Sequence, residues 1–376
     1  MELEDDFATF LADIRPTANQ RQNMQTGHEA LRERLRADDT LQSILISDFL
    51  QGSYRRSTAV RPKNDKRSDV DIIVVTTLSE AQYTPAAALN LFEPFLNKHY
   101  KGKWRRQGRS FGIELSYVEL DLVPTSAPSE AAVRILKAAA VTSDDDVEAA
   151  RDWRLHPSWV ALSARGAAGV EALLREAKAQ KEWQISPLRI PDRDANRWES
   201  THPIEQIRWT AAKNRQTNRH FVNVVKAIKW WRVEMHEKPE HPKGFPLERL
   251  VGECCPDGIQ TVAEGVTRTL EEIVAKYALL AQAGGKPQLP DYGVPSHDVF
   301  KRVSAEDFKT FYDQAVEAAT LSRRALDEED RTESGNLWRE LLGGKFPNPP
   351  NGGGGTKKAG YTPPVAPAVP GSGRFA

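Results

Sequence analysis

Three aspartates in or beside two apolar segments constrain the fold of this chain more than any other feature. Asp69 and Asp71 open the β-branched segment 70–76, and Asp121 lies within the apolar segment 111–123. Alternate residues of a strand face the same side of a sheet, so Asp69 and Asp71 are expected to be neighbours. Charged side chains beside a buried strand cost folding free energy unless they are paired or serve a functional site. We therefore expect two strands to meet around an acidic site.

Such a site points to metal-assisted chemistry. Carboxylates held side by side repel each other, and a cation relieves that repulsion. Hard oxygen ligands favour Mg²⁺ or Mn²⁺ over zinc. If the strand of Asp121 pairs near the strand of Asp69 and Asp71, the three can hold two ions for an in-line phosphoryl displacement. Asp121 is then expected on the acceptor side, where it helps to deprotonate the attacking hydroxyl. An isolated Asp-x-Asp pattern is usually a solvated loop or strand edge, but the apolar neighbours favour the metal site.

A Gly-Ser turn precedes the acidic residues. Gly52 and Ser53 follow the apolar segment 44–50, which is typical of a short strand. Glycine lets a backbone approach a phosphate closely, a serine hydroxyl can donate to it, and successive backbone N–H groups form an anion nest. A Gly-Ser pair alone is most often only a turn. Its place ahead of the aspartates predicts a triphosphate-binding turn.

The coarse pattern predicts an α+β fold with two lobes. Residues 1–200 mix helical and strand-like segments, and we expect them to form an α+β lobe with an N-terminal helix. Residues 201–345 form a helical lobe, and the Pro- and Gly-rich residues 346–376 form a disordered tail. The signals over 144–193 are mixed and support no prediction. The long helices expected in the second lobe cover 204–236, as one helix or a pair, 259–283 and 304–325.

Two lysines lie on the helix expected over residues 221–232. Lys226 and Lys229 are three residues apart, so both project from one helix face. Two ammonium groups there could neutralise the phosphates that the metals do not reach. The alternative is an ordinary solvated basic face. The neighbouring Trp230 and Trp231 are expected in the core.

Composition excludes several classes of protein and of site. The formal net charge is zero and the pI is about 7.1, so no global field attracts long nucleic acid. No apolar segment reaches the roughly 20 residues that span a bilayer, and the N-terminus lacks a signal-peptide layout. The two cysteines, Cys254 and Cys255, are adjacent and fit neither a structural disulfide nor a zinc site. We expect a cytoplasmic monomer that needs neither membrane nor long nucleic acid.

These motifs resemble the bacterial CD-NTases, the cGAS/DncV-like nucleotidyltransferases of anti-phage CBASS systems. The resemblance starts from three motifs at residues 51–53, 69–71 and 118–124. It continues over residues 192–198, 201–203, 225–231, 243–248 and 289–311. It covers nearly the whole chain, and the pattern is most similar to clade D.

The resemblance implies a polymerase-β-like nucleotidyltransferase lobe and a helical lobe, with nucleotides bound in the cleft between them. It also implies an enzyme that joins nucleoside triphosphates through successive 3′–5′ bonds, releases pyrophosphate at each step and closes a ring. The expected substrates are ATP and GTP with two Mg²⁺ or Mn²⁺ ions. The expected product is an adenine-containing cyclic trinucleotide, such as the second messenger cyclic AMP-AMP-GMP.

The resemblance also gives roles to single residues. The three aspartates match the metal-binding carboxylates of the family, and Ser53 matches the serine that contacts the triphosphate. Lys226 and Lys229 match basic positions that face the donor triphosphate in the related oligoadenylate synthetases. Phe245 lies where an aromatic residue, often tyrosine, stacks on the donor base. Phenylalanine keeps the stacking surface and loses the hydroxyl.

The same resemblance implies a role for the tail. Some CD-NTases are joined through their C-terminus to targets by an E1/E2-like ligase, much as ubiquitin is. A disordered arm that ends in a small residue, Ala376, would fit such a ligase. The alternative is an inert terminus.

Other functions remain open at the level of sequence. Another polymerase-β-type enzyme would transfer a single nucleotide to a small molecule or a protein with the same Gly-Ser and Asp-x-Asp motifs. A nucleotide-binding scaffold without catalysis is disfavoured because the carboxylate set is complete. A sequence-specific nucleic-acid binder is disfavoured by the neutral charge and the lack of a recognisable reading module.

Overall fold

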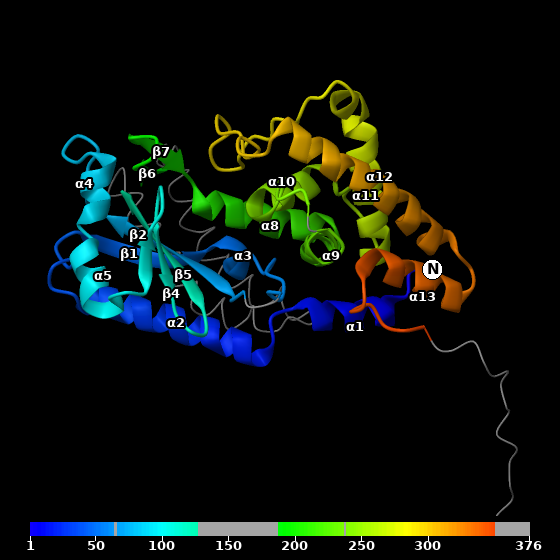
Figure 1. The fold of residues 1–376 in the computed structure, drawn as a ribbon, viewed down its shortest axis with the longest axis horizontal. Coiled ribbons are helices and arrows are strands. Elements are labelled where there is room, and N and C mark those ends of the chain that lie inside the picture. Colours follow the sequence, from blue (N-terminus) through cyan, green and yellow to red (C-terminus); the bar gives the residue numbers. More distant parts are fainter. Residues whose placement is uncertain (64–65, 127–186, 237, 350–376) are drawn as a thin grey trace, which may run out of the picture.

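The computed structural model of the protein describes residues 1–63, 66–126, 187–236 and 238–349. A half built on a sheet and a half built of helices lie side by side (Figure 1). The predicted α+β class is therefore confirmed. Ala376, most of the predicted tail and most of segment 144–193 lie outside the described residues.

The sheet is mixed, and its central pair is parallel. Its main path runs β1 (Leu45–Gln51), β2 (Asp69–Thr76), β5 (Glu119–Ser126), β4 (Phe111–Glu114) and β3 (Trp104–Arg106). Only the β2–β5 pair on this path is parallel. At the end of β5, Ser126 pairs with β6 (Leu188–Asp192), which forms a hairpin with β7 (Arg197–Thr201). The two segments that carry aspartates are thus adjacent strands in one register.

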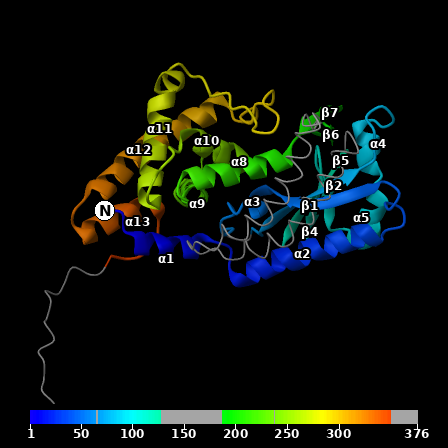
Figure 2. The same ribbon diagram turned by 180° about the vertical axis from the view of Figure 1, so that it is seen from behind.

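One face of the sheet is buried under helices, and the other carries the aspartates. The helices that share the buried core with this face are α2 (Ala18–Ala37), α4 (Pro85–Asn90) and α5 (Glu93–Tyr100). Val70, Ile72 and Val74 of β2 belong to that core. Because side chains alternate along a strand, Asp69 and Asp71 lie on the opposite face. In both views of the molecule, α2 runs along one side of the sheet (Figures 1 and 2).

The N-terminal helix belongs to the helical half by its packing. The apolar side chains of α1 (Glu4–Ile14) enter the core of that half. Phe7 meets Trp338 edge-on with ring centroids 4.9 Å apart, and it meets Phe346 at 5.2 Å. We expected α1 in the nucleotidyltransferase lobe and residue 346 in the tail, and the structure differs at both places. The physical reason is the aromatic face of α1, whose partners lie on the helical side.

The helical half contains the long helices that the sequence predicts. They are the pair α8 (Pro203–Gln216) and α9 (Phe221–Glu234), then α11 (Val262–Gln282) and α12 (Ala305–Asp327). The half also contains two helices that were not among the predicted long ones, α10 (Gly244–Cys254) and α13 (Arg331–Leu342). The segment 204–236 is a pair of helices because Asn218 and Arg219 take positive φ angles of 50° and 71° between them. The Ser304 side chain accepts a hydrogen bond from the Asp307 backbone, as expected of an N-cap.

The helix α9 lies at the centre of this half. Trp230 and Trp231 are both 3% exposed, which confirms their predicted place in the core. None of the helices in the described ranges combines the length and apolar character needed to cross a membrane.

We predict that Phe7→Ala lowers the free energy of unfolding by about 3–5 kcal/mol, the usual cost of removing a buried phenylalanine. Chemical denaturation of the full chain measures it. Leu279→Ala is the control, because Leu279 is 81% exposed and its loss should change little. A cost for Phe7→Ala no larger than for the control would contradict the packing of α1.

Candidate active site

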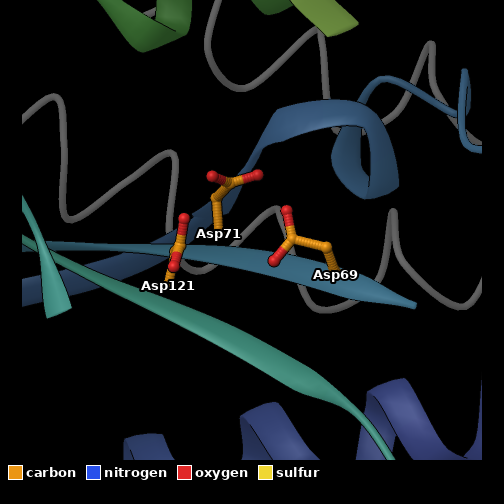
Figure 3. Close-up of side chains that lie close together, drawn as sticks. All are labelled: Asp69, Asp71 and Asp121. Carbon is orange, nitrogen blue, oxygen red and sulfur yellow. The ribbon is translucent and has the colours of Figure 1, made fainter. Parts of the chain in front are cut away.

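Strand register brings residues of five strands into one row across the sheet. The row runs Gln51, Asp71, Asp121, Gly112 and Arg105. Directly opposed residues point to the same face, so Asp71 and Asp121 are side by side. Asp69 lies two residues before Asp71 on that same face. Ligand atoms of the three carboxylates all lie within 4.8 Å of one another, and Figure 3 shows them gathered on one side of the strands.

The pKa values reflect this crowding. Desolvation, and then the negative charge of Asp71, raises the pKa of Asp69 to about 8. Desolvation and Asp71 also raise the pKa of Asp121 to about 6. Burial raises the pKa of Asp71 as well, although the nearby Arg56 guanidinium opposes the shift. A folded chain without cations therefore holds protons at this site well above the usual range of aspartate.

The turn of Gly52 and Ser53 lies directly over the acidic pair. Gly52 begins the short helix α3 (Gly52–Arg55) with a φ of 75°. A Cβ at this position would lie 1.7 Å from Asp71 Oδ2, so a side chain here would push the Asp71 carboxylate out of its place. The carbonyl of Ser53 accepts hydrogen bonds from the backbone of Thr58 and Ala59, at 2.9 and 3.2 Å, and folds the following loop back. The glycine is thus required by Asp71 as well as by the backbone.

A buried ion network ties this turn to the helical half. Glu248 of α10 accepts from Arg56 Nε at 3.1 Å and from Lys229 Nζ of α9 at 3.0 Å. Lys229 Nζ also donates to the carbonyl of Thr58 at 3.0 Å. Desolvation alone would raise the pKa of Glu248, but the charges of Arg56 and Lys229 outweigh it and lower the pKa to about 2. The carboxylate therefore stays ionised, and the loop after α3 is fixed to two helices.

The two lysines of α9 do not both face an open site. Lys226 is 2% exposed, and its Nζ donates to Asn223 Oδ1 at 3.2 Å. Burial lowers the pKa of Lys226 well below its ordinary value. Lys229 lies close enough to Asp71 for its charge to lower the pKa of that carboxyl. The structure thus brings Lys229 near the aspartates and keeps Lys226 inside the protein.

Phe245 lies beside the same network. It is half-buried near the start of α10, and the Arg56 guanidinium lies 5.0 Å from the centre of its ring. The backbone path from Phe245 to Glu248 is one turn of helix, so the ring and the buried carboxylate share a side of α10.

Sequence reasoning missed three residues around the site. Arg56 and Glu248 carry the ion network, and the Gln107 amide donates to Asp121 Oδ1 at 3.1 Å. Glu248 lies in residues 243–248, one of the segments on which the family resemblance is based. The resemblance could have drawn attention to Glu248, but it assigned this residue no role. Gln107 has no signal of its own in the sequence, because a loop glutamine is ordinary.

The fold and the site define a class of enzyme. A Gly-Ser turn over three aspartates on adjacent strands, joined to a helical half, is the arrangement of a nucleotidyltransferase. The model of the Second Messenger Oligonucleotide or Dinucleotide Synthetase domain matches residues 1–139.

Relatives extend that match to the whole chain. The cyclic AMP-AMP-GMP synthase of Enterobacter hormaechei subsp. hoffmannii is 46% identical over 383 residues, with 100% of both chains covered. The cyclic AMP-AMP-AMP synthase of Acinetobacter sp. is 29% identical and covers 92% of this chain and 86% of its own. The structure of E. coli MS115-1 CdnC with ATP has a TM-score of 0.62 at 16% identity and covers 93% of this chain and 100% of CdnC.

The chain therefore belongs to the bacterial CD-NTases, the cGAS/DncV-like nucleotidyltransferases that make cyclic oligonucleotides. The prediction of this family and of its enzyme class is confirmed.

We predict that Glu248→Gln lowers the stability at pH 7 by about 3–5 kcal/mol, because it leaves two buried cations without their partner. The pKa of Glu248 is depressed, so its stabilising effect is present above its ordinary value of 4.5 and is lost as pH falls towards about 2. The gap between mutant and wild type should close over that range in denaturation experiments. Glu272→Gln, on an exposed part of α11, is the control. An unchanged gap at pH 3 would contradict the assignment.

Proposed function

We propose that this protein joins ATP and GTP into cyclic AMP-AMP-GMP as a second messenger in anti-phage defence. The observation that carries the proposal is the 46% identity, over the full length of both chains, to an enzyme with that product. The three carboxylates beneath the Gly-Ser turn support the chemistry. The resemblance to clade D supports the choice of an adenine-rich trinucleotide.

The residues of the site fit divalent cations. Three carboxylates offer hard oxygen ligands within 4.8 Å of one another, and their raised pKa values indicate a site short of positive charge. We propose that Asp69, Asp71 and Asp121 hold two Mg²⁺ or Mn²⁺ ions. When bound, such ions supply stabilisation of the attacking and leaving oxygens in a phosphoryl transfer.

The chain's own groups would orient the nucleotides. We propose that the Ser53 hydroxyl and the backbone around Gly52 hold the donor triphosphate, and that Asp121 faces the acceptor hydroxyl and helps to take its proton. Phe245 would stack on the donor base. Lys229 would support the turn through Thr58, and a direct contact of Lys226 with phosphate would require it to leave its buried position.

The setting of the enzyme is proposed on the same basis. We propose a cytoplasmic monomer that binds nucleoside triphosphates and requires no long nucleic acid. Attachment of Ala376 to a target by an E1/E2-like ligase stays a proposal from the family resemblance. Binding of the nucleotides between the half built on the sheet and the helical half also stays a proposal.

We predict that the purified protein with Mg²⁺ and four nucleoside triphosphates makes a product that resists phosphatase and has the mass of cyclic AMP-AMP-GMP. Asp69→Asn with Asp71→Asn should abolish synthesis because the site loses two of its three charges, and circular dichroism should show a folded protein. Asp39→Asn, at an exposed position, is the matched control. Mass spectrometry identifies the product.

Products other than cyclic AMP-AMP-GMP would change the proposed function in different ways. Linear products alone, or transfer of one nucleotide to an added aminoglycoside, would favour the single-transfer enzyme. A ring of three adenylates would keep the class and change the third base. Full activity of the double mutant would remove the metal site.

We predict that Mn²⁺ affinity rises as pH increases from 5.5 to 8. The pKa values of Asp121 and Asp69 are raised to about 6 and about 8. Both carboxyl groups therefore carry a proton at low pH, which stabilises the folded chain, and they lose it as pH rises through this window. Cations then replace the protons, so binding at pH 6 should release protons. Calorimetry in two buffers with different ionisation enthalpies measures both effects. An affinity independent of pH would contradict the prediction.

A further inference from the structure

The loop between β3 and β4 holds an amide group against the third aspartate. Gln107 Nε2 donates to Asp121 Oδ1 at 3.1 Å. The Ser110 hydroxyl donates to the other end of the same amide, Gln107 Oε1. Because the oxygen of the amide is occupied by a donor, its nitrogen is left to face the carboxylate. The Gln107 backbone N–H also donates to the Ser110 carbonyl at 3.0 Å, which closes the loop 107–110.

A glycine opposite the aspartate makes room for this amide. Gly112 of β4 is the direct partner of Asp121 in the antiparallel β4–β5 pair. A Cβ on Gly112 would lie 2.8 Å from Gln107 Nε2 and 3.2 Å from the guanidinium carbon of Arg105. Glycine inside a strand often marks a close approach of another group, and here that group is the side chain that contacts Asp121.

The loop is held in place from its other side by the β6–β7 hairpin. Arg109 Nε donates to Asp192 Oδ2 at 2.7 Å, and Arg109 also pairs with Glu199. The backbone N–H of Arg193 donates to the Gly108 carbonyl at 2.8 Å. The acidic partners are well buried, with 7% of the Asp192 side chain and 9% of the Glu199 side chain exposed. Residues 192–198 belong to the family resemblance, which assigned them no role. Asp192 and Arg193 of this segment hold the loop 107–110 in place.

We propose that Gln107 is a positioning residue that orients Asp121 for cation binding, and that the Arg109 clamp on the β6–β7 hairpin keeps Gln107 in place. This inference rests on the proposed metal role of Asp121. A neutral amide suits the task because it fixes one oxygen of the carboxylate without cancelling its charge. Groups that orient metal ligands in this way commonly change metal affinity by about 10–100-fold when they are removed.

The test is direct Mn²⁺ binding to the full chain, measured by electron paramagnetic resonance of the free ion, with no nucleotide present. Gln107→Met keeps the length of the side chain and removes both polar atoms. We expect its Mn²⁺ dissociation constant to rise about tenfold or more. The Mn²⁺ concentration for half-maximal synthesis should shift in parallel, while the rate at saturating Mn²⁺ recovers towards that of wild type. Gln42→Met is the control, because Gln42 is exposed and precedes the end of β1 that is remote from the aspartates.

A second variant reaches the same hydrogen bond from another side. Gly112→Ala should displace the Gln107 amide and weaken Mn²⁺ binding in the same direction, so it carries the test if Gln107→Met does not fold. Asp121→Asn distinguishes the positioning role of Gln107 from the metal role of Asp121. If Asp121→Asn loses Mn²⁺ affinity and both other variants bind like wild type, the positioning role is wrong and the metal site stands. If Asp121→Asn itself binds Mn²⁺ like wild type, the proposed metal site is wrong, and the role of Gln107 is wrong with it.

Discussion

The repulsion among three carboxylates is the interaction on which the rest of this structure depends. Parallel pairing of β2 with β5 sets Asp71 opposite Asp121, and strand alternation adds Asp69. Buried β-branched residues on the other face lock the register, because a shift by one residue would turn every side chain over. The core thus holds the acidic groups together against their charge. The free energy stored in that contact is available to any cation that binds there.

The Gly-Ser turn and the helical half are organised around this acidic centre. Gly52 passes so close to Asp71 that a side chain in its place would displace the carboxylate. Beyond the turn, Arg56 enters a buried ion network with Glu248 and Lys229, which come from different helices. A buried network of this kind is weak evidence for stability, since hydrophobic residues often do as well. Its value here is geometric, because it connects the turn that would grip a triphosphate to the half that would hold the base.

Sequence reasoning reached the centre of the site and stopped at its surroundings. The aspartates, the turn and the long helices carry strong local signals: charges on apolar strands, a glycine before a hydroxyl, and periodic apolar residues. The lysines of α9 show the limit, since helical spacing placed Lys226 and Lys229 on one face but did not reveal that this face is buried. Packing of α1 on Phe346, and the approach of Gln107 to Asp121, depend on contacts between remote segments. No local pattern encodes such contacts.

Anomalous diffraction from crystals grown with Mn²⁺ and a non-hydrolysable nucleoside triphosphate tests the central claim most directly. The account predicts anomalous peaks within coordination distance of Asp69, Asp71 and Asp121, and none at these positions in crystals of Asp69→Asn with Asp71→Asn. Peaks at other residues alone, with the three carboxylates free of metal beside a bound triphosphate, would contradict it.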